Sequence, residues 1–509
     1  MRKPSSGTHS RLERAIRASE RLTLSISQRA LVSTLFAASL GFTCLVGCGG
    51  DDEPQPSGAL GASCDPKQAT CSTGLSCTLV PDGAYHCYAP TILRGMVKDT
   101  SNGEPVKGAH VMALNEQGAP VTDVAETDAT GNYELAVPAA RDDGGKPVDT
   151  KFTLRAAAQD YQAFPYGARV SLPVDVEGAP VEDGRYVVES ALTTIDLIPL
   201  PAGDRSRIEG SIVAHDGDAD APVGGVLVVA KGDDGVESAI SDQSGAFTVF
   251  NVPAGEQELK AYGANIQIES KSVTVTEDSL TGVSLHELDG ATTTVSGSVQ
   301  LVNAAGGSKT SVILVVEDTF DKDVARGEAP RGLRSPETGA PNVSGAFSIT
   351  GVPAGKYVVL AAYENDDLVR DPDTNISGTD FVHIEVMAGE PTLAISDGFK
   401  VTQALGTVSP GVEGPEAVTE KPDLVWMDDS SEDGYDLRVF DALGNEVWQK
   451  LELPPVKGAK NVTVKYEGPL DPGMYYQFRV TSWREPGQGE RAPISTTEDL
   501  RGVFFLPTP

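Results

Sequence analysis

Three stretches of the sequence decide the fold: Asp128-Ala129-Thr130-Gly131-Asn132-Tyr133, Asp242-Gln243-Ser244-Gly245-Ala246-Phe247 and Asn342-Val343-Ser344-Gly345-Ala346-Phe347. In each stretch small or polar residues precede a glycine, a combination typical of a hairpin turn that needs positive φ. In each, the aromatic residue is followed two positions later by an aliphatic residue, so both lie on one face of a strand. We therefore expect three related units, each with a hairpin that leads into a half-buried strand.

The sequence on either side of these turns repeats as well. Each unit opens with a glycine that has an aliphatic residue two positions later, in Gly95-Met96-Val97, Gly210-Ser211-Ile212 and Gly297-Ser298-Val299. Each aromatic strand ends in a proline turn, in Val137-Pro138-Ala139, Val252-Pro253-Ala254 and Val352-Pro353-Ala354. Proline cannot donate to a β-ladder, so pairing should end near it. The repeated pattern predicts an all-β chain of tandem β-sandwich modules.

A wider set of residues in the first unit forms the pattern Gly95, Val97, Asp99, Pro105, Val106, Gly108, Ala109, Val111, Thr127, Asp128, Gly131 and Tyr133. This pattern resembles the carboxypeptidase regulatory-like domain, which implies a seven-strand, transthyretin-like sandwich. The second unit follows the pattern in part, and the third lacks its central proline stretch and has a long insertion around residues 318–340. In metallocarboxypeptidases this module accompanies the catalytic domain and does not cleave. The resemblance therefore assigns no catalytic residue.

The C-terminal part of the chain has a different rhythm. Six residues fall at spacing two, namely Leu470, Pro472, Met474, Tyr476, Phe478 and Val480. This spacing resembles a late strand of a fibronectin type III domain, which implies that Tyr476 is its corner tyrosine and Trp426 its core tryptophan. Trp448 and Trp483 could offer stacking platforms to a ligand, but their positions on strands favour packing.

The N-terminus has the layout of a signal peptide: residues 1–29 are polar and basic, and residues 30–46 are apolar. The sequence Leu45-Val46-Gly47-Cys48 resembles the lipobox of bacterial lipoproteins, which implies that Cys48 is lipidated and becomes the first mature residue. An uncleaved anchor helix is the alternative, although the apolar run is at the lower limit for crossing a bilayer. Because Gly49 follows the cysteine, the resemblance implies sorting to the outer membrane.

Four of the six cysteines, Cys64, Cys71, Cys77 and Cys87, lie within 24 residues of one another. An even, clustered set in an exported chain predicts two disulfides, and three pairings are possible. A zinc site is the alternative, but the spacing contains no C-x2-C pair.

The expected organisation runs from end to end of the chain. It comprises a signal peptide at 1–47, a flexible tether at 48–60, a two-disulfide module at 61–90, regulatory-like sandwiches at 92–202 and 205–289, a divergent third sandwich at 292–390, and a fibronectin III-like sandwich at 395–509.

The net charge of −33 argues against nucleic acid as a partner, because phosphates would repel such a chain. We find no metalloprotease, nucleophile-elbow or phosphate-loop motif, so we expect no enzyme activity and no required cofactor. Alternating carboxylates at Asp216, Asp218 and Asp220 make calcium a possible ligand. A second acidic group, at residues 364–373, has a similar composition.

These observations together predict a non-catalytic, lipid-anchored protein of the cell envelope. Its sandwich modules would serve structural or adhesive contacts, with a polysaccharide or an envelope protein as ligand, and could be exposed at the cell surface. One alternative is a carbohydrate-binding surface lipoprotein, although aromatic residues make up only 6% of the chain. Another is an accessory part of a metallocarboxypeptidase system, but no stretch is long enough for its catalytic domain.

Overall fold

The computed structural model describes residues 58–508, except for gaps at 67–69, 81–82, 143, 168, 217–218, 303–308, 323–325, 338–340, 363–380, 397, 403, 430–431, 457, 459, 486–490 and 499. The described residues belong to one compact unit of the chain, residues 55–509. The lipobox and Cys48 lie outside the described residues.

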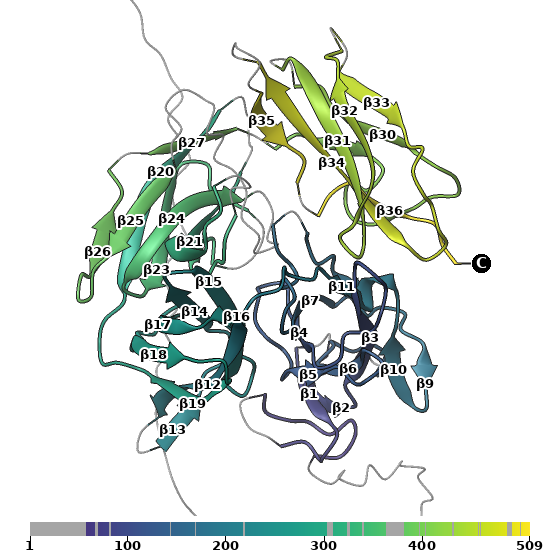
Figure 1. The fold of residues 1–509 in the computed structure, drawn as a ribbon. Coiled ribbons are helices and arrows are strands. Elements are labelled where there is room, and N and C mark those ends of the chain that lie inside the picture. The colour runs from purple at the N-terminus through teal and green to yellow at the C-terminus, as the bar shows by residue number, and fades with distance from the viewer. Residues whose placement is uncertain are drawn as a thin grey trace, which may run out of the picture. The chain divides into compact units, whose positions relative to one another are not determined.

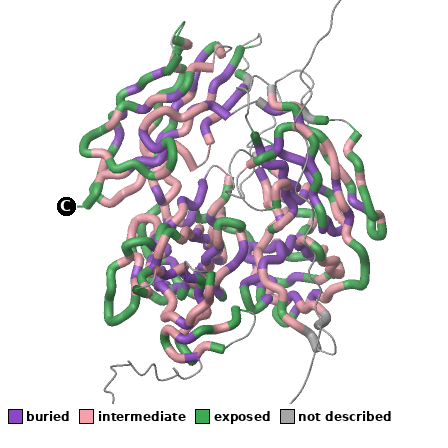
Figure 2. Tube along the Cα trace, turned by 180° about the vertical axis from the view of Figure 1, so that it is seen from behind, coloured by how far each residue is buried: buried purple, intermediate pink, exposed green. Residues whose placement is uncertain are grey.

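The described residues form 36 strands and two 3-10 helices of three residues each, so the predicted all-β fold class is confirmed (Figure 1). The chain begins with a two-stranded hairpin of β1 (Ser76–Leu79) and β2 (Tyr85–Tyr88), and tandem β-sandwiches follow it. Buried residues alternate with less buried ones along many of the strands, and Figure 2 shows buried segments in each of the sandwiches.

The first sandwich consists of a five-stranded and a four-stranded sheet. The larger sheet contains β3 (Thr91–Asp99), β6 (Asn132–Val137), β9 (Val181–Glu182), β10 (Arg185–Val188) and β11 (Thr194–Leu197), with the helix η1 (Ala191–Thr193) before β11. The smaller sheet contains β4 (His110–Leu114), β5 (Ala125–Glu126), β7 (Lys151–Ala157) and β8 (Val174–Asp175).

The second sandwich consists of two four-stranded sheets. One contains β12 (Arg205–Asp216), β13 (Ala219–Pro222), β16 (Ala246–Pro253) and β19 (Leu280–His286). The other contains β14 (Leu227–Gly232), β15 (Gly235–Ile240), β17 (Gly255–Tyr262) and β18 (Lys271–Val275).

The third sandwich repeats this plan. One sheet contains β20 (Thr293–Val302), β23 (Ala346–Val352), β26 (Thr392–Ala394) and β27 (Phe399–Thr402), and the other contains β21 (Ser311–Val316), β22 (Arg334–Ser335), β24 (Gly355–Ala362) and β25 (Val382–Val386). The helix η2 (Glu317–Thr319) follows β21. Both β26 and β27 pair with β20, so this sandwich continues to residue 402, beyond the expected end at 390.

The fourth sandwich consists of a three-stranded and a six-stranded sheet. The smaller contains β28 (Thr407–Ser409), β30 (Asp423–Met427) and β33 (Asn461–Lys465). The larger contains β29 (Glu416–Ala417), β31 (Gly434–Asp441), β32 (Glu446–Leu453), β34 (Tyr475–Arg484), β35 (Ala492–Thr496) and β36 (Val503–Phe505). Trp426 is fully buried and meets the ring of Tyr435 edge-on, with centroids 5.5 Å apart.

The repeated glycine and the repeated aromatic residue lie directly opposite each other in the ladder, in the pairs Gly95–Tyr133, Gly210–Phe247 and Gly297–Phe347. A Cβ at Gly95 would come within 1.8 Å of the Thr193 carbonyl oxygen and 2.6 Å of the Tyr133 hydroxyl. The aromatic ring therefore occupies the space above the glycine, and a side chain there would displace it. The aromatic residues and their aliphatic partners two positions on are buried in all three units, as predicted.

The first and last strands of each repeat run parallel and side by side. β3 pairs with β11, β12 pairs with β19, and β20 pairs with β26 and β27. The chain therefore enters and leaves each of these sandwiches through neighbouring strands of one sheet.

Two strands are buried on both faces, which an alternating pattern would not produce. Val228 and Ala230 of β14 face the core of the second sandwich, whereas Leu227 and Val229 join an apolar cluster with residues of the third sandwich. Every residue of β21 is buried as well. Continuous apolar runs of this kind are typical of strands that are covered on both sides.

Candidate functional site

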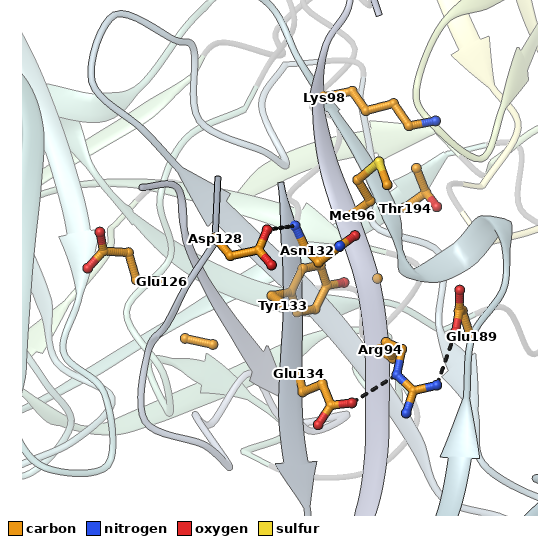
Figure 3. A pocket seen from close by; sticks show the side chains of 12 residues that line it. Arg94, Met96, Lys98, Glu126, Asp128, Asn132, Tyr133, Glu134, Glu189 and Thr194 are labelled. Carbon is orange, nitrogen blue, oxygen red and sulfur yellow. Dashed lines mark hydrogen bonds and ion pairs between the residues drawn. The ribbon is translucent and has the colours of Figure 1, made fainter. Parts of the chain in front are cut away.

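The first sandwich has a groove of about 650 Å³ on the outer face of its larger sheet (Figure 3). The groove is lined by Arg94, Gly95, Met96, Lys98, Ala125, Glu126, Asp128, Asn132, Tyr133, Glu134, Glu189 and Thr194. The alternation of β3 and β6 explains this lining: Val97 and Leu135 point into the core, while their neighbours Met96 and Glu134 point outward.

Arg94, which lines the groove, forms ion pairs with three carboxylates. Its guanidinium lies 2.8 Å from Glu134, 2.8 Å from Glu182 and 3.4 Å from Glu189. The hydrogen bonds that Arg94 donates to Glu182 and Glu134 raise the pKa of Arg94, and the bond that Glu134 accepts from Arg94 lowers the pKa of Glu134. Because Nε and Nη1 of Arg94 are engaged by three carboxylates, Arg94 organises the groove, and the negative charges around it disfavour an anionic ligand.

Asp128 holds the hairpin turn at one end of the groove. Its carboxylate accepts hydrogen bonds from the Thr130 hydroxyl at 2.7 Å and from the backbone amides of Thr130 and Asn132 at 2.8 and 3.0 Å. These bonds, led by the Thr130 hydroxyl, lower the pKa of Asp128. Asp242 binds Ser244 and Ala246 in the same way in the second sandwich, so the repeated acidic residue serves the turn.

The groove contains no histidine or cysteine. The Tyr133 hydroxyl donates a 2.6 Å hydrogen bond to the Thr193 carbonyl oxygen, and burial raises the pKa of Tyr133 far above its usual value. Tyr133 is therefore held as a neutral donor. The remaining lining groups suit hydrogen bonding to a polar ligand.

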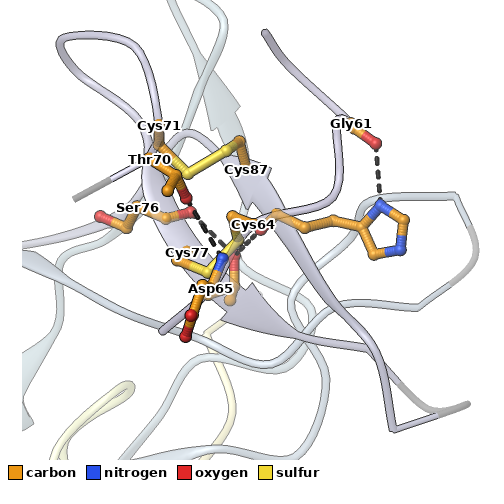
Figure 4. The surroundings of a disulfide bond; sticks show 10 residues. Gly61, Cys64, Asp65, Thr70, Cys71, Ser76, Cys77 and Cys87 are labelled. Carbon is orange, nitrogen blue, oxygen red and sulfur yellow. Dashed lines mark hydrogen bonds between the residues drawn. A yellow bond between two sulfur atoms is a disulfide. The ribbon is translucent and has the colours of Figure 1, made fainter. Parts of the chain in front are cut away.

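The four clustered cysteines form two disulfides, Cys64–Cys77 and Cys71–Cys87, which are the two bonds that the sequence predicts (Figure 4). The structure selects one of the three possible pairings. The sulfur atoms of Cys64, Cys71 and Cys77 lie within 4.8 Å of one another, the only such group of possible metal ligands among the described residues. As disulfide sulfurs they lack the thiolate charge that zinc requires.

Four of the described histidines have separate contacts. Nδ1 of His86 lies 2.8 Å from the Gly61 carbonyl oxygen, Nδ1 of His286 lies 2.9 Å from Glu269, and Nδ1 of His383 lies 2.9 Å from Glu317. His110 meets the ring of Phe250 edge-on, with ring centroids 4.9 Å apart, and burial lowers its pKa.

The residues proposed for calcium lie at the hairpin between β12 and β13. Asp216 pairs with Ala219 and His215 pairs with Asp220 in the ladder, which places Asp216 and Asp220 on the two arms. Asp218 lies outside the described residues, as does the second acidic group at residues 364–373.

An acidic loop that sequence reasoning passed over lies between β30 and β31. The Tyr435 hydroxyl donates to Asp428 at 2.9 Å and accepts from the Asp429 amide at 2.8 Å, and the Ser482 hydroxyl donates to Asp429 at 2.7 Å. Burial raises the pKa of Glu432 in the same loop, and the charges of Asp428 and Asp429 add to this effect. The sequence signal was the run from Asp428 to Asp433.

The other two tryptophans of the fourth sandwich belong to its packing. Trp483 is 9% exposed, and Arg491 lies over its ring at 4.4 Å. Trp448 meets the ring of Tyr466 edge-on at 5.3 Å. These contacts fit the packing role that their strand positions favour.

No helix among the described residues has the length and apolarity needed to cross a membrane. No curated protein significantly matches this chain. Among solved structures, the minor pilin of Streptococcus agalactiae matches with a TM-score of 0.15 at 13% identity, over 39% of this chain and 96% of that chain. The major pilin subunit of Bacillus cereus matches with a TM-score of 0.17 at 13% identity, over 62% of this chain and 98% of that chain.

The TIE protein of Bacillus anthracis matches with a TM-score of 0.15 at 11% identity, over 87% of this chain and 76% of that chain. At such TM-scores these likenesses carry no argument about fold or function. The family comparison is local and specific: residues 92–164 match the model of the carboxypeptidase regulatory-like domain. They include the turn that begins at Asp128, the glycine–aromatic pair Gly95–Tyr133 and most of the groove. The first sandwich of this chain therefore contains a carboxypeptidase regulatory-like domain.

Proposed function

We propose that this protein is a non-catalytic, lipid-anchored component of a bacterial cell envelope that presents tandem β-sandwiches for structural or adhesive contacts. The observation that carries the proposal is the order of the parts. The lipobox ending at Cys48 is followed by two disulfides between residues 64 and 87, and then by sandwiches with closed apolar cores. Disulfides of this kind persist in oxidising compartments, which agrees with export.

We assign the fourth sandwich to a fibronectin type III-like module. The Tyr476 hydroxyl accepts a hydrogen bond from the Asp471 amide at 3.0 Å and donates to the Asp471 carboxylate at 3.2 Å. This local bond to a residue five positions upstream supports the role of corner tyrosine, and the full burial of Trp426 supports the role of core tryptophan.

The anchor is tested by fatty-acid labelling of living cells. We expect an alkyne-tagged fatty acid to label the wild-type protein and a Cys44→Ala variant. The Cys48→Ala variant should carry no label. Cys44 is a matched control because it lies in the apolar segment, four residues before Cys48. Label that persists in Cys48→Ala would contradict the anchor.

Surface display is tested separately by adding protease to intact cells. Digestion of the sandwiches in intact cells would support display outside the outer membrane. Digestion only after the outer membrane has been permeabilised would place the modules in the periplasm and contradict surface exposure.

The groove of the first sandwich supports a polysaccharide ligand as a second candidate function, because its lining is rich in hydrogen-bonding groups. Binding of envelope polysaccharide to the wild type but not to a Glu134→Ala variant would favour it. An equal response of both proteins would exclude the groove as the binding surface.

Calcium remains a proposal for the hairpin that carries Asp216, Asp218 and Asp220. Titration calorimetry should show calcium binding that is weakened in Asp218→Asn. No heat of binding from the wild type would contradict the proposal.

A further inference from the structure

The insertion that separates the third unit from the family pattern is packed against other modules. We call residues 317–335 the strap; it begins with η2, ends with β22, and is described except for residues 323–325. Long insertions usually run over the surface and remain solvated. Here Leu333 is fully buried, and Arg326 and Arg334 are 7% and 8% exposed.

The strap binds the first sandwich through a bidentate ion pair. The two terminal nitrogens of Arg155, on β7, donate to the two carboxylate oxygens of Glu328 at 3.1 and 2.9 Å. The side chains are only 15% and 23% exposed. Two parallel bonds between a guanidinium and a carboxylate fix both distance and orientation, so this pair positions the strap against β7.

The strap binds the second sandwich through a second ion pair and an apolar contact. Nζ of Lys231, on β14, lies 2.5 Å from the carboxylate of Asp318. Leu333 belongs to the same apolar cluster as Leu227 and Tyr262 of the second sandwich. A Cβ at Gly225 would lie 3.6 Å from Cδ of Arg331, a separation of ordinary van der Waals contact.

Residues from all three sandwiches line one small cavity beside the strap. Its wall includes Leu154 and Val170 of the first sandwich, Leu227 of the second, and Ala329 and Pro330 of the strap. The cavity measures about 60 Å³, so little unfilled space remains where the three modules meet.

The strap is also fixed to its own sandwich. The Val316 amide donates to the Glu328 carbonyl oxygen at 3.0 Å, and the Leu314 amide donates to the Leu333 carbonyl oxygen at 3.0 Å. The Glu328 amide donates to the Thr319 hydroxyl at 2.9 Å. The carboxylate of Glu328 is therefore presented from a backbone that β21 holds in place.

We propose that the strap locks the third sandwich against the first two, so that the three repeats behave as one rigid body. Tandem domains with small polar contacts normally move relative to one another. The bidentate pair, the second ion pair and the shared apolar cluster together provide the kind of interface that prevents such motion. The proposal goes beyond the display function and does not depend on a lipid anchor.

The experiment uses charge reversal in the full chain, solubilised in detergent. Arg155→Glu and Glu328→Arg each create a like-charge pair, and the double variant restores an opposite-charge pair. Arg438→Glu is the control, because Arg438 forms an exposed 2.6 Å pair with Glu446 within the fourth sandwich. Hydrogen exchange followed by mass spectrometry reports local opening, and small-angle scattering reports the radius of gyration.

We expect each single reversal to speed amide exchange in the strap by about tenfold, since the strap becomes an open surface segment. The radius of gyration should rise in both single variants, and the double variant should return both quantities toward wild type. The control should change neither. If a single reversal leaves exchange in the strap and the radius of gyration unchanged, or if the double variant fails to recover them, the strap does not lock the modules.

A milder pair of variants keeps the test valid if a reversal prevents folding. Glu328→Gln removes the charge and retains the shape, and Lys231→Ala removes the second ion pair. Circular dichroism first establishes that the strand content is unchanged. Faster exchange confined to the strap and to β7 in Glu328→Gln supports the proposal, and exchange equal to wild type in both variants overturns it.

Discussion

Asn251 and Asp160, which belong to successive sandwiches, are joined by a 2.6 Å hydrogen bond from the Asp160 amide to the side-chain oxygen of Asn251. Both residues have left-handed backbone conformations, with φ of 62° and 67°. The side-chain nitrogen of Asn251 donates to the carbonyl oxygens of Ala158 at 3.1 Å and Tyr161 at 2.8 Å. One buried side chain thus satisfies three backbone groups of the preceding module.

Replacement of Asn251 by glycine should therefore loosen the junction between the first two sandwiches. Glycine keeps the left-handed backbone at no steric cost, so the loss reports the side chain alone. We expect a fall of about 2–3 kcal/mol in the free energy of unfolding, because buried backbone groups lose their partners. Urea unfolding measures this change. A matched Asp183→Gly change, at an exposed position that is also left-handed, with φ of 47°, should cost well below about 1 kcal/mol, and equal losses at both positions would contradict the junction role.

Replacement of Gly95 by alanine should destabilise the first sandwich by about 3 kcal/mol, the upper end for overpacking. The added Cβ would clash with the carbonyl oxygen of Thr193. Because this atom belongs to the backbone, it cannot move away by a change of side-chain rotamer. Thermal unfolding measures the effect. Gly345→Ala is the control, since a Cβ there meets nothing within 4 Å. A variant at Gly95 as stable as the control would refute the glycine–aromatic packing.

Glu237 should make the stability of the second sandwich depend on pH. Burial raises the pKa of Glu237 to about 7. This value lies above the pKa of the same carboxyl in the unfolded chain. The contribution of Glu237 to the free energy of unfolding is therefore greatest below about pH 4.5 and is lost as the pH rises through 7. The Glu237→Gln variant should lose less stability between pH 5 and 8 than the wild type. A Glu177→Gln variant, at an exposed site, should retain the wild-type slope.

Removal of both disulfides should affect the N-terminal segment selectively. A segment this short has little apolar core of its own, and each native disulfide contributes about 2–4 kcal/mol. We expect a variant with serine at all four cysteine positions to be cleaved rapidly by protease between residues 58 and 90. The sandwiches should remain resistant. Cleavage at the wild-type rate would show that the disulfides are not what holds this segment.

The local features of the fold could be predicted from the sequence because their causes are local. The turn that begins at Asp128 needs only its own carboxylate and a glycine, and the alternation after Tyr133 fixes which face is buried. The pairing of Cys64 with Cys77 could not be predicted, since it depends on how the loop folds back. The even, clustered set of four cysteines in a chain expected to be exported was enough to predict two disulfides.

The contacts between modules left weaker signals. The run from Val226 to Ala230 is apolar at every position and lacks the alternation of a half-buried strand. This continuous run is the sequence sign that β14 is buried on both faces, one of them toward the third sandwich. The insertion itself was visible as a departure from the repeat. Its partner Arg155 was not, because it is some 170 residues away along the chain and looks like any outward-facing residue of a strand.

The parallel pairing of the first and last strands in each repeat has a consequence for a protein held at one end. A pull along the chain enters β12 and leaves through β19, so the hydrogen bonds between these strands are stretched side by side and in shear. They must break together, whereas a hairpin pulled from its open end unzips one bond at a time. Each repeat therefore resists tension applied at its two ends, because its first and last strands can separate only in shear.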